Sequence, residues 1–361
     1  MAYTTIDDPS AHFQTEIYAG SGSDDKVVTN SGNSDLQPDW IWIKKRSATG
    51  QHVLSDTNRG ILKVLNSNSD AAEDSNSEGE MVKSVQSDGF TLGDSQAGQG
   101  DTNYTSGGTY VAWQWKANGG TTSTNTAGTN IDTTVQANTT AGFSLITYTG
   151  TGTNNDSIGH GLGAVPHWIT VKNRDETNRW TVYHHKNTSS PETEYLNLQD
   201  TTATTDVATR WNDTAPTSTV ITLGDNDGVS KANTKYVCYA FTEIQGYSKF
   251  GSYTGNGSED GTFVYTGFKP AFVITKRTDT AKNWYMFDNK RTPFNVIANL
   301  IAPNLSSAED SGTGTYIDFL SNGFKLRQDF SHMNASGGTH IYMAFAEHPF
   351  VSSKGVPTTA R

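Results

Sequence analysis

Cysteine is nearly absent from this sequence, and Cys238 is its single thiol. One cysteine cannot form a disulfide within the chain, so packing and hydrogen bonds must hold the fold, as in proteins that fold in a reducing cytoplasm. The chain also lacks any run of 18 apolar residues, and its start, MAYTTIDDPSAHF, lacks the basic and apolar regions of a secretory signal. We therefore expect neither export through the Sec pathway nor insertion into a membrane.

Charged residues are scarce, at 17% of the chain, and the excess of acidic ones gives a formal net charge of −11. No cluster of lysine and arginine offsets that excess. Binding to nucleic acid or to an anionic membrane depends on clustered basic side chains that meet phosphate. The composition therefore disfavours both kinds of partner.

The sequence also lacks the patterns of common catalytic sites. It contains no P-loop, no zinc-ligand spacing, no Gly-x-Ser-x-Gly elbow and no alternating carboxylate pair of the kind that glycan-cleaving enzymes use. His184 and His185 are adjacent at the end of an expected strand, so their rings point to opposite faces and cannot hold one metal ion together. We predict no enzymatic activity, no cofactor and no metal site.

What the chain does contain is a long repeat. A proline-led element occurs three times, as PDWIWIKKR, PHWITVKNR and PAFVITKR, from Pro38, Pro166 and Pro270. A second element, YVAWQW, YVCYAF or HIYMAF, begins 70 to 72 residues after each proline, and a third, YAGSG, YTGTG or YTGNG, begins 17 to 20 residues before it. Three elements in one order at near-constant spacing indicate a repeat of roughly a hundred residues, the size of a small domain.

This repeat predicts three tandem modules of about 105 residues. Module 1 covers residues 1–117, module 2 residues 140–245 and module 3 residues 246–350. Residues 118–139, rich in Gly, Ser, Thr and Asn, are predicted to be a linker, and residues 351–361 a polar tail. Because the short junction between modules 2 and 3 contains aromatic residues, we expect those two to dock tightly and module 1 to be offset.

The second element predicts strands with one face in a core. Trp113, Tyr239 and Met343 share a face that is apolar in all three copies, so we expect them to be buried. Cys238 lies on the other face among small residues, and we interpret it as a small buried hydrophobic side chain. With about eight short strands per module and no helical pattern, we predict an all-β fold of antiparallel β-sandwiches, jelly-roll or concanavalin-like.

Two polar loops recur at matching positions in modules 1 and 3. They contain the candidate binding residues Asp56, Asn58 and Arg59 in SDTNRG, and Asp288, Asn289, Lys290 and Arg291 in FDNKR. Asp, Asn and Arg beside an aromatic ring suit sugar, because hydroxyl pairs accept forked hydrogen bonds and the apolar sugar face stacks on the ring. The alternative is an Asp–Arg bond that merely holds the loop in shape. Module 2 has YHHKN there, so we expect it to bind differently or not at all.

Several long phrases resemble a family of repeat-containing virion proteins of tailed bacteriophages that is abundant in aquatic phages. They include QPDWIWIKKR, YVAWQWKANGG, NASGGTHIYMAFAEHPF and GYSKFGSYTGNGSEDGTFVYTGFKPAFVITKRTD. The resemblance covers nearly the whole chain. It implies a structural, surface-exposed virion protein, tail fibre-like or concanavalin-like, assembled in the host cytoplasm as a homo-oligomer with other virion proteins as partners.

Two roles remain open. A tail-associated fibre or receptor-binding protein would recognise host-surface polysaccharide, and the polar and aromatic loops favour that role. A capsid decoration or cement protein is the alternative. It is favoured because the sequence has no coiled-coil heptads and no long shaft, which are common in trimeric fibres.

Overall fold

The protein is described here by a computed structural model that places residues 2–75, 80–94, 101–312 and 314–357. Within these ranges the only helices are two single 3-10 turns, η1 (Pro9–Ala11) and η2 (Pro191–Thr193), and all other regular elements are β-strands. The predicted all-β fold is confirmed. In the part of the chain that is described, no helix is long and apolar enough to cross a membrane.

Each module contains four antiparallel strands in the same spatial order, which we call its inner sheet. In module 1 the order is β1 (Phe13–Ala19), β9 (Thr109–Trp115), β3 (Trp40–Lys45) and β4 (His52–Asp56). In module 2 it is β13 (Phe143–Thr149), β20 (Lys235–Phe241), β15 (Trp168–Asn173) and β16 (Thr181–His184). In module 3 it is β21 (Ser248–Thr254), β27 (Thr339–Pro349), β23 (Phe268–Arg277) and β24 (Trp284–Asp288).

A three-stranded outer sheet faces each inner sheet, and a separate apolar cluster fills the space between them. The outer sheets are β2 (Lys26–Val28), β8 (Gly89–Leu92) and β7 (Val82–Gln86); β11 (Asn130–Ile131), β14 (Asp156–Gly159) and β19 (Val220–Leu223); and β22 (Phe263–Tyr265), β26 (Gly323–Leu326) and β25 (Ile317–Leu320). Further short strands are β5 (Lys63–Val64), β6 (Asp74–Ser75), β17 (Glu194–Asn197) and β18 (Thr205–Asp206).

The proline-led strands β3, β15 and β23 occupy equivalent positions. In each, the aromatic residue two places after the repeated proline pairs with an aromatic residue of the second strand of the sheet and, on its other side, with the last residue of the fourth strand. These sets are Trp40 with Trp115 and Asp56, Trp168 with Phe241 and His184, and Phe272 with Phe345 and Asp288. This register makes positions in the three modules directly comparable.

The segment predicted to be a linker, residues 118–139, is instead part of the sandwich of module 2. It contains β10 (Ser123–Asn125), β11 and β12 (Thr133–Asn138). β12 pairs with β13 along its whole length, and β11 pairs with β14. Only Ile131 and Val135 bury apolar side chains there, because these strands are held mainly by backbone hydrogen bonds to their neighbours. A Thr- and Asn-rich composition was therefore a misleading signal.

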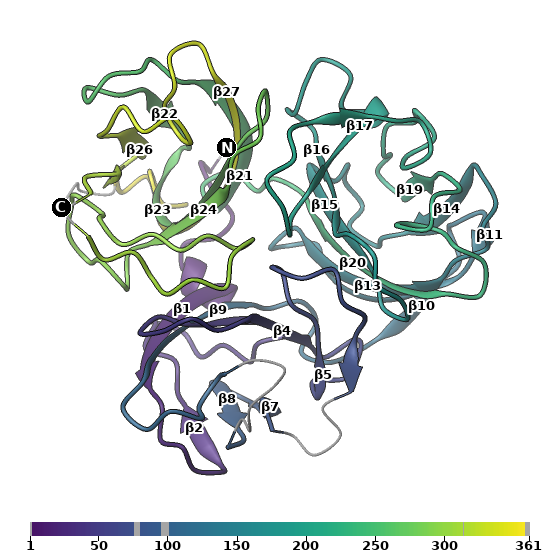
Figure 1. The fold of residues 1–361 in the computed structure, drawn as a ribbon, viewed down its shortest axis with the longest axis horizontal. Helices are drawn as coiled ribbons and strands as arrows, with labels where there is room; N and C mark the ends of the chain where they lie inside the picture. The colour runs from purple at the N-terminus through teal and green to yellow at the C-terminus, as the bar shows by residue number, and fades with distance from the viewer. Residues whose placement is uncertain (1, 76–79, 95–100, 313, 358–361) are drawn as a thin grey trace.

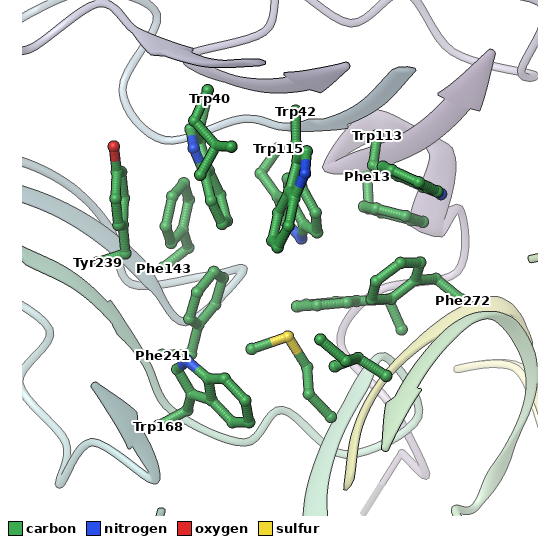
Figure 2. Packing of buried hydrophobic residues seen from close by; sticks show 14 of the residues in the cluster. Phe13, Trp40, Trp42, Trp113, Trp115, Phe143, Trp168, Tyr239, Phe241 and Phe272 are labelled. Carbon is green, nitrogen blue, oxygen red and sulfur yellow. The ribbon is translucent and has the colours of Figure 1, made fainter. Parts of the chain in front are cut away.

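The three modules surround a common centre, as the three lobes of Figure 1 show. Their inner sheets share one aromatic core at that centre, part of which is drawn in Figure 2. Ring pairs join every two modules: Trp40 with Tyr239 at 4.5 Å, Phe13 with Phe345 at 5.2 Å and Trp168 with Trp284 at 5.8 Å between ring centroids. The expectation that module 1 would be offset is therefore wrong.

The predicted core residues lie where the alternation placed them. Trp113, Tyr239 and Met343 are all buried in this central core, and Cys238 is fully buried on the opposite face of its strand. Burial raises the pKa of the Cys238 thiol, as expected for a side chain that serves only to fill space.

Candidate functional site

The two predicted binding loops lie at contacts between modules, which we call seams. Asp56 ends β4 at the seam of modules 1 and 2 (seam 1–2), and Asp288 ends β24 at the seam of modules 3 and 1 (seam 3–1). Both carboxylates have no exposed surface, and Arg59 and Arg291 are each only 6% exposed. These four residues are thus interior groups.

At seam 1–2, Arg59 is the centre of an ion-pair cluster. Its Nε lies 2.5 Å from Asp56 Oδ2, and its Nη1 donates to Glu73 Oε2 at 2.8 Å. Across the seam, Arg174 donates to both oxygens of Glu73 at 2.8 Å, and Tyr239 Oη donates to Asp56 Oδ2 at 2.8 Å. Two carboxylates thus face two guanidinium groups, and Lys63 Nζ lies 3.8 Å from Glu73 Oε1 as a further cation.

Seam 3–1 has the same construction with different residues. Arg291 Nε lies 2.6 Å from Asp288 Oδ2, and its Nη1 donates to Glu309 Oε2 at 2.8 Å. Arg46 crosses the seam to donate to Glu309 Oε1 and Oε2 at 2.8 and 3.0 Å. Trp113 Nε1 donates to Asp288 Oδ2 at 3.0 Å, as Tyr239 does to Asp56. The ion-pair clusters of the two seams therefore correspond to each other residue by residue.

The electrostatics favour the charged forms of Arg59, Glu73 and Arg291. Burial alone lowers the pKa of Arg59, but Asp56 and the nearby acidic groups outweigh it and the net pKa is raised. Burial likewise raises the pKa of Glu73, yet Arg174 and Arg59 outweigh it and the net pKa is lowered. Removing one member of such a buried set leaves an uncompensated charge, which is strongly destabilising. The arrangement suits a structural lock, and sugar binding by Asp56, Arg59, Asp288 or Arg291 is corrected to the Asp–Arg alternative.

The seam of modules 2 and 3 (seam 2–3) is built from neutral groups. His184 takes the position of Asp56 and Asp288, and its Nε2 lies 3.2 Å from Tyr342 O. His185 Nε2 lies 2.6 Å from Phe250 O. Burial lowers the pKa of His184 to about 3 and that of His185 to about 4, so both rings are neutral at ordinary pH. Module 2 therefore differs from modules 1 and 3 in the chemistry of its seam, and the prediction that it binds differently or not at all stays a prediction.

The remaining three candidates lie nearer the surface. Asn58 Nδ2 donates to Thr134 O and Leu145 O, each at 2.9 Å, and so holds strands β12 and β13 of the next module. Asn289 and Lys290 instead line a cavity of about 330 Å³ at seam 3–1. Of the seven predicted residues, Asn289 and Lys290 are the two that line this cavity.

The cavity has mixed polar and apolar walls. Its floor is the open edge of β1, and module 3 forms the opposite wall; the lining residues are Asp8, Ser10, Phe13, Gln14, Thr15, Ser31, Gly32, Asn33, Ala271, Asn289, Lys290, Pro293, Ala346, Glu347 and His348. Lys290 Nζ donates to Ser31 Oγ at 2.8 Å and lies 3.7 Å from Glu16.

Sequence analysis missed a set of buried lysines. Lys44, Lys172 and Lys276 have no exposed surface, and each ammonium donates to the carbonyl of the next residue at 2.7 Å. Burial lowers the pKa of each to about 8. The signal was present, because a lysine follows the apolar stretch in WIWIK, WITVK and FVITK, but a lysine at a strand end is usually solvated.

Comparisons with known proteins add a family and no function. A family described as "Domain of unknown function (DUF7483)" matches residues 8–349. Among curated proteins and solved structures, none matches this chain. Within the described ranges, no group of three or more His, Cys, Asp or Glu residues is arranged to hold a metal ion.

Proposed function

The chain belongs to the DUF7483 family, and within that family we propose that it is a structural, surface-exposed protein of a tailed-phage virion, assembled in the host cytoplasm. The proposal rests on the resemblance of its repeated phrases to phage virion proteins. The structural observation that carries it is the shared core: three sandwiches close around one aromatic centre, and buried ion pairs lock two of the three seams. Such a body is rigid and presents several outer faces to neighbours.

A tail-associated, receptor-binding role is the first placement. The loops at the seams do not support this role, because their Asp and Arg side chains are buried, but exposed aromatic side chains elsewhere support it. Phe263 and Tyr265 on β22 are 44% and 53% exposed, and Tyr3 Oη lies 3.3 Å from Tyr265 Oη. Exposed aromatic rings beside hydroxyl groups suit the apolar face and the hydroxyls of a neutral host polysaccharide. A net charge of −11 suits a neutral glycan better than a polyanion.

Capsid decoration is the second placement. The observation that favours it is the arrangement of three equivalent lobes around one centre in Figure 1. A body of this kind can sit on a threefold axis of a shell and offer each surrounding subunit a similar lobe, because lobe and subunit are then repeated by the same rotation. Enzymatic activity has no part in either placement.

One experiment separates the two placements. The purified protein is sedimented with host cells in one tube and with undecorated capsid shells in the other. A tail-associated role predicts adhesion to cells that Phe263→Ala and Tyr265→Ala abolish. The matched control is Val27→Ala, at the position equivalent to Phe263 on β2 and 57% exposed. Binding to shells alone would support decoration, and binding to neither would contradict the virion role.

A further inference from the structure

The first strand of each inner sheet has an edge that faces a seam. These strands, β1, β13 and β21, hold the same place in the sheet order. The edge of this strand is covered in two different ways at seams 1–2 and 2–3 and is open at seam 3–1.

At seam 1–2 the edge of β13 is covered by β12. Besides its pairing with β13, β12 makes three hydrogen bonds with module 1. Thr57 Oγ1 donates to Gln136 Oε1 at 2.9 Å, and Asn58 Nδ2 donates to Thr134 O at 2.9 Å. Asn138 Nδ2 donates back to Lys116 O at 3.3 Å. The edge of β13 is thus closed by β12, which is held by three hydrogen bonds to Thr57, Asn58 and Lys116 of module 1.

At seam 2–3 a side chain closes the edge instead of a strand. His185 Nε2 lies 2.6 Å from Phe250 O of β21, and the ring of His167 packs on that of His185 with centroids 4.3 Å apart. Phe250 is the counterpart of Leu145, because each pairs with the central core residue of its module, Met343 or Tyr239. The same backbone position is thus satisfied in both seams by different means.

At seam 3–1 the equivalent edge is open. β1 is the outermost strand of its sheet, and the 330 Å³ cavity lies along Phe13–Thr15. Counting from the shared register, Asn289, Lys290 and Ala346 are the counterparts of Thr57, Asn58 and Lys116. All three line the cavity. The residues that hold β12 at seam 1–2 therefore have counterparts here around a space in which none of the described residues forms a strand.

The backbone of β1 also faces this space. His12 O accepts a hydrogen bond from Lys116 N, so in an antiparallel pair the even-numbered residues bond to β9. The backbone groups of Phe13 and Thr15 then point away from β9, toward the cavity. Two side chains add unused capacity: Thr15 Oγ1 is buried without a partner, and the Asn289 carboxamide makes no hydrogen bond to the described residues.

We propose that this cavity accepts an extended polypeptide segment of a partner protein, which adds to β1 as an antiparallel strand in the way that β12 adds to β13. The segment is uncharged and made of small polar and β-branched residues, as in TTVQAN of β12, because the walls offer amide, ammonium and carboxylate groups in near balance. The inference goes beyond the proposed function and does not depend on it.

The test uses the chain's own strand as a probe. A synthetic peptide with the sequence of residues 131–140 is added to the full protein at concentrations up to the order of 1 mM, and amide hydrogen exchange is followed. We expect slower exchange in residues 13–19 and no change in the edge strand β22. The control peptide carries Thr134→Pro and Gln136→Pro, which remove donors to the ladder, and should have no effect.

Variants separate this site from unspecific binding. Asn289→Ala and Lys290→Ala should each weaken peptide binding about fivefold, the loss of one hydrogen bond. The double variant Ala271→His with Asn289→His copies His167 and His185, which fold at these positions in module 2. It should protect β1 without peptide and abolish peptide binding, and its melting temperature reports that it is folded.

The proposal is overturned if the peptide leaves exchange in residues 13–19 of the unmodified protein unchanged, a result that does not depend on any variant. It is also overturned if the prolyl peptide protects the segment equally well. Protection by a host polysaccharide and not by peptide would make the cavity a sugar site and contradict strand addition.

Discussion

Tyr239 donates a hydrogen bond to Asp56 across seam 1–2, although the two residues are 183 positions apart. Trp113 makes the equivalent bond to Asp288 across seam 3–1. At seam 2–3 the equivalent central residue is Met343, which has no N–H or O–H to donate, and the facing residue is a neutral histidine, His184. An aspartate thus occurs where the facing ring can donate, and a histidine where it cannot, because a buried carboxylate without donors is costly.

Tyr239→Phe should therefore lower the free energy of unfolding by about 1 to 3 kcal/mol, because Asp56 loses a donor in the interior. Tyr183→Phe is the control, since that ring is also buried and its hydroxyl makes no hydrogen bond to the described residues. Urea unfolding measures both. Equal effects of the two substitutions would mean that the bond to Asp56 contributes nothing.

Glu309→Gln should destabilise the protein by about 3 kcal/mol, because Arg291 and Arg46 then share a buried site with too little negative charge. The matched control is Glu243→Gln, which removes a pair with Lys249 that is partly exposed and should cost less than about 1 kcal/mol. Thermal unfolding of the two variants measures this difference. A similarly small loss of stability in both variants would show that the buried cluster does not stabilise the contact between modules 3 and 1.

Trp113→Ala should cost about 3 to 5 kcal/mol as a large-to-small change in the core. The shared core changes how the loss appears. Since Trp113 contacts Phe272 and Asp288 of module 3, we expect one cooperative transition at a lower temperature rather than separate unfolding of module 1. Calorimetry distinguishes the outcomes, and an unchanged melting profile would contradict the burial of this ring.

Acid should weaken seam 2–3. His184 and His185 have folded-state pKa values of about 3 and 4, both below the ordinary value of 6.5. Between the folded-state pKa values and 6.5, the unfolded chain binds more protons than the folded protein does. The stability that the two neutral histidines contribute is therefore complete above pH 6.5 and is lost as the pH falls toward 4. Each histidine adds a slope of up to about 1.4 kcal/mol per pH unit.

The measurement is the free energy of unfolding in urea from pH 7 to pH 5. The variant His184→Gln with His185→Gln should show a smaller slope than the unmodified protein, though not a flat one, since other buried histidines such as His160 and His340 titrate in the same direction. Identical slopes in both proteins would rule out a contribution from this seam.

Much of the fold could be predicted from local patterns, and the site could not. The alternation around Trp113, Tyr239 and Met343 specified a buried face because each strand carries that signal in its own residues. The burial of Arg59 depends on Arg174, which is more than a hundred positions away, and no local pattern announces such a partner. β12 was missed for a related reason: its bonds to β13 use the backbone, which every residue type shares.

The ion pair between Arg46 and Glu309 closes the three modules into a ring, because it joins the first module to the last. Described residues near the two ends of the chain also contact each other, since Ser353 N donates to Asp7 Oδ1 at 2.6 Å, and Tyr3 Oη donates to Gly267 O of module 3 at 2.8 Å. The chain itself connects the modules at seams 1–2 and 2–3, and only at seam 3–1 do the two modules meet without being consecutive in the sequence. A circular permutation that joins residues 7 and 353 by a short loop and opens the chain between modules 2 and 3 would therefore retain the spatial arrangement of the ring.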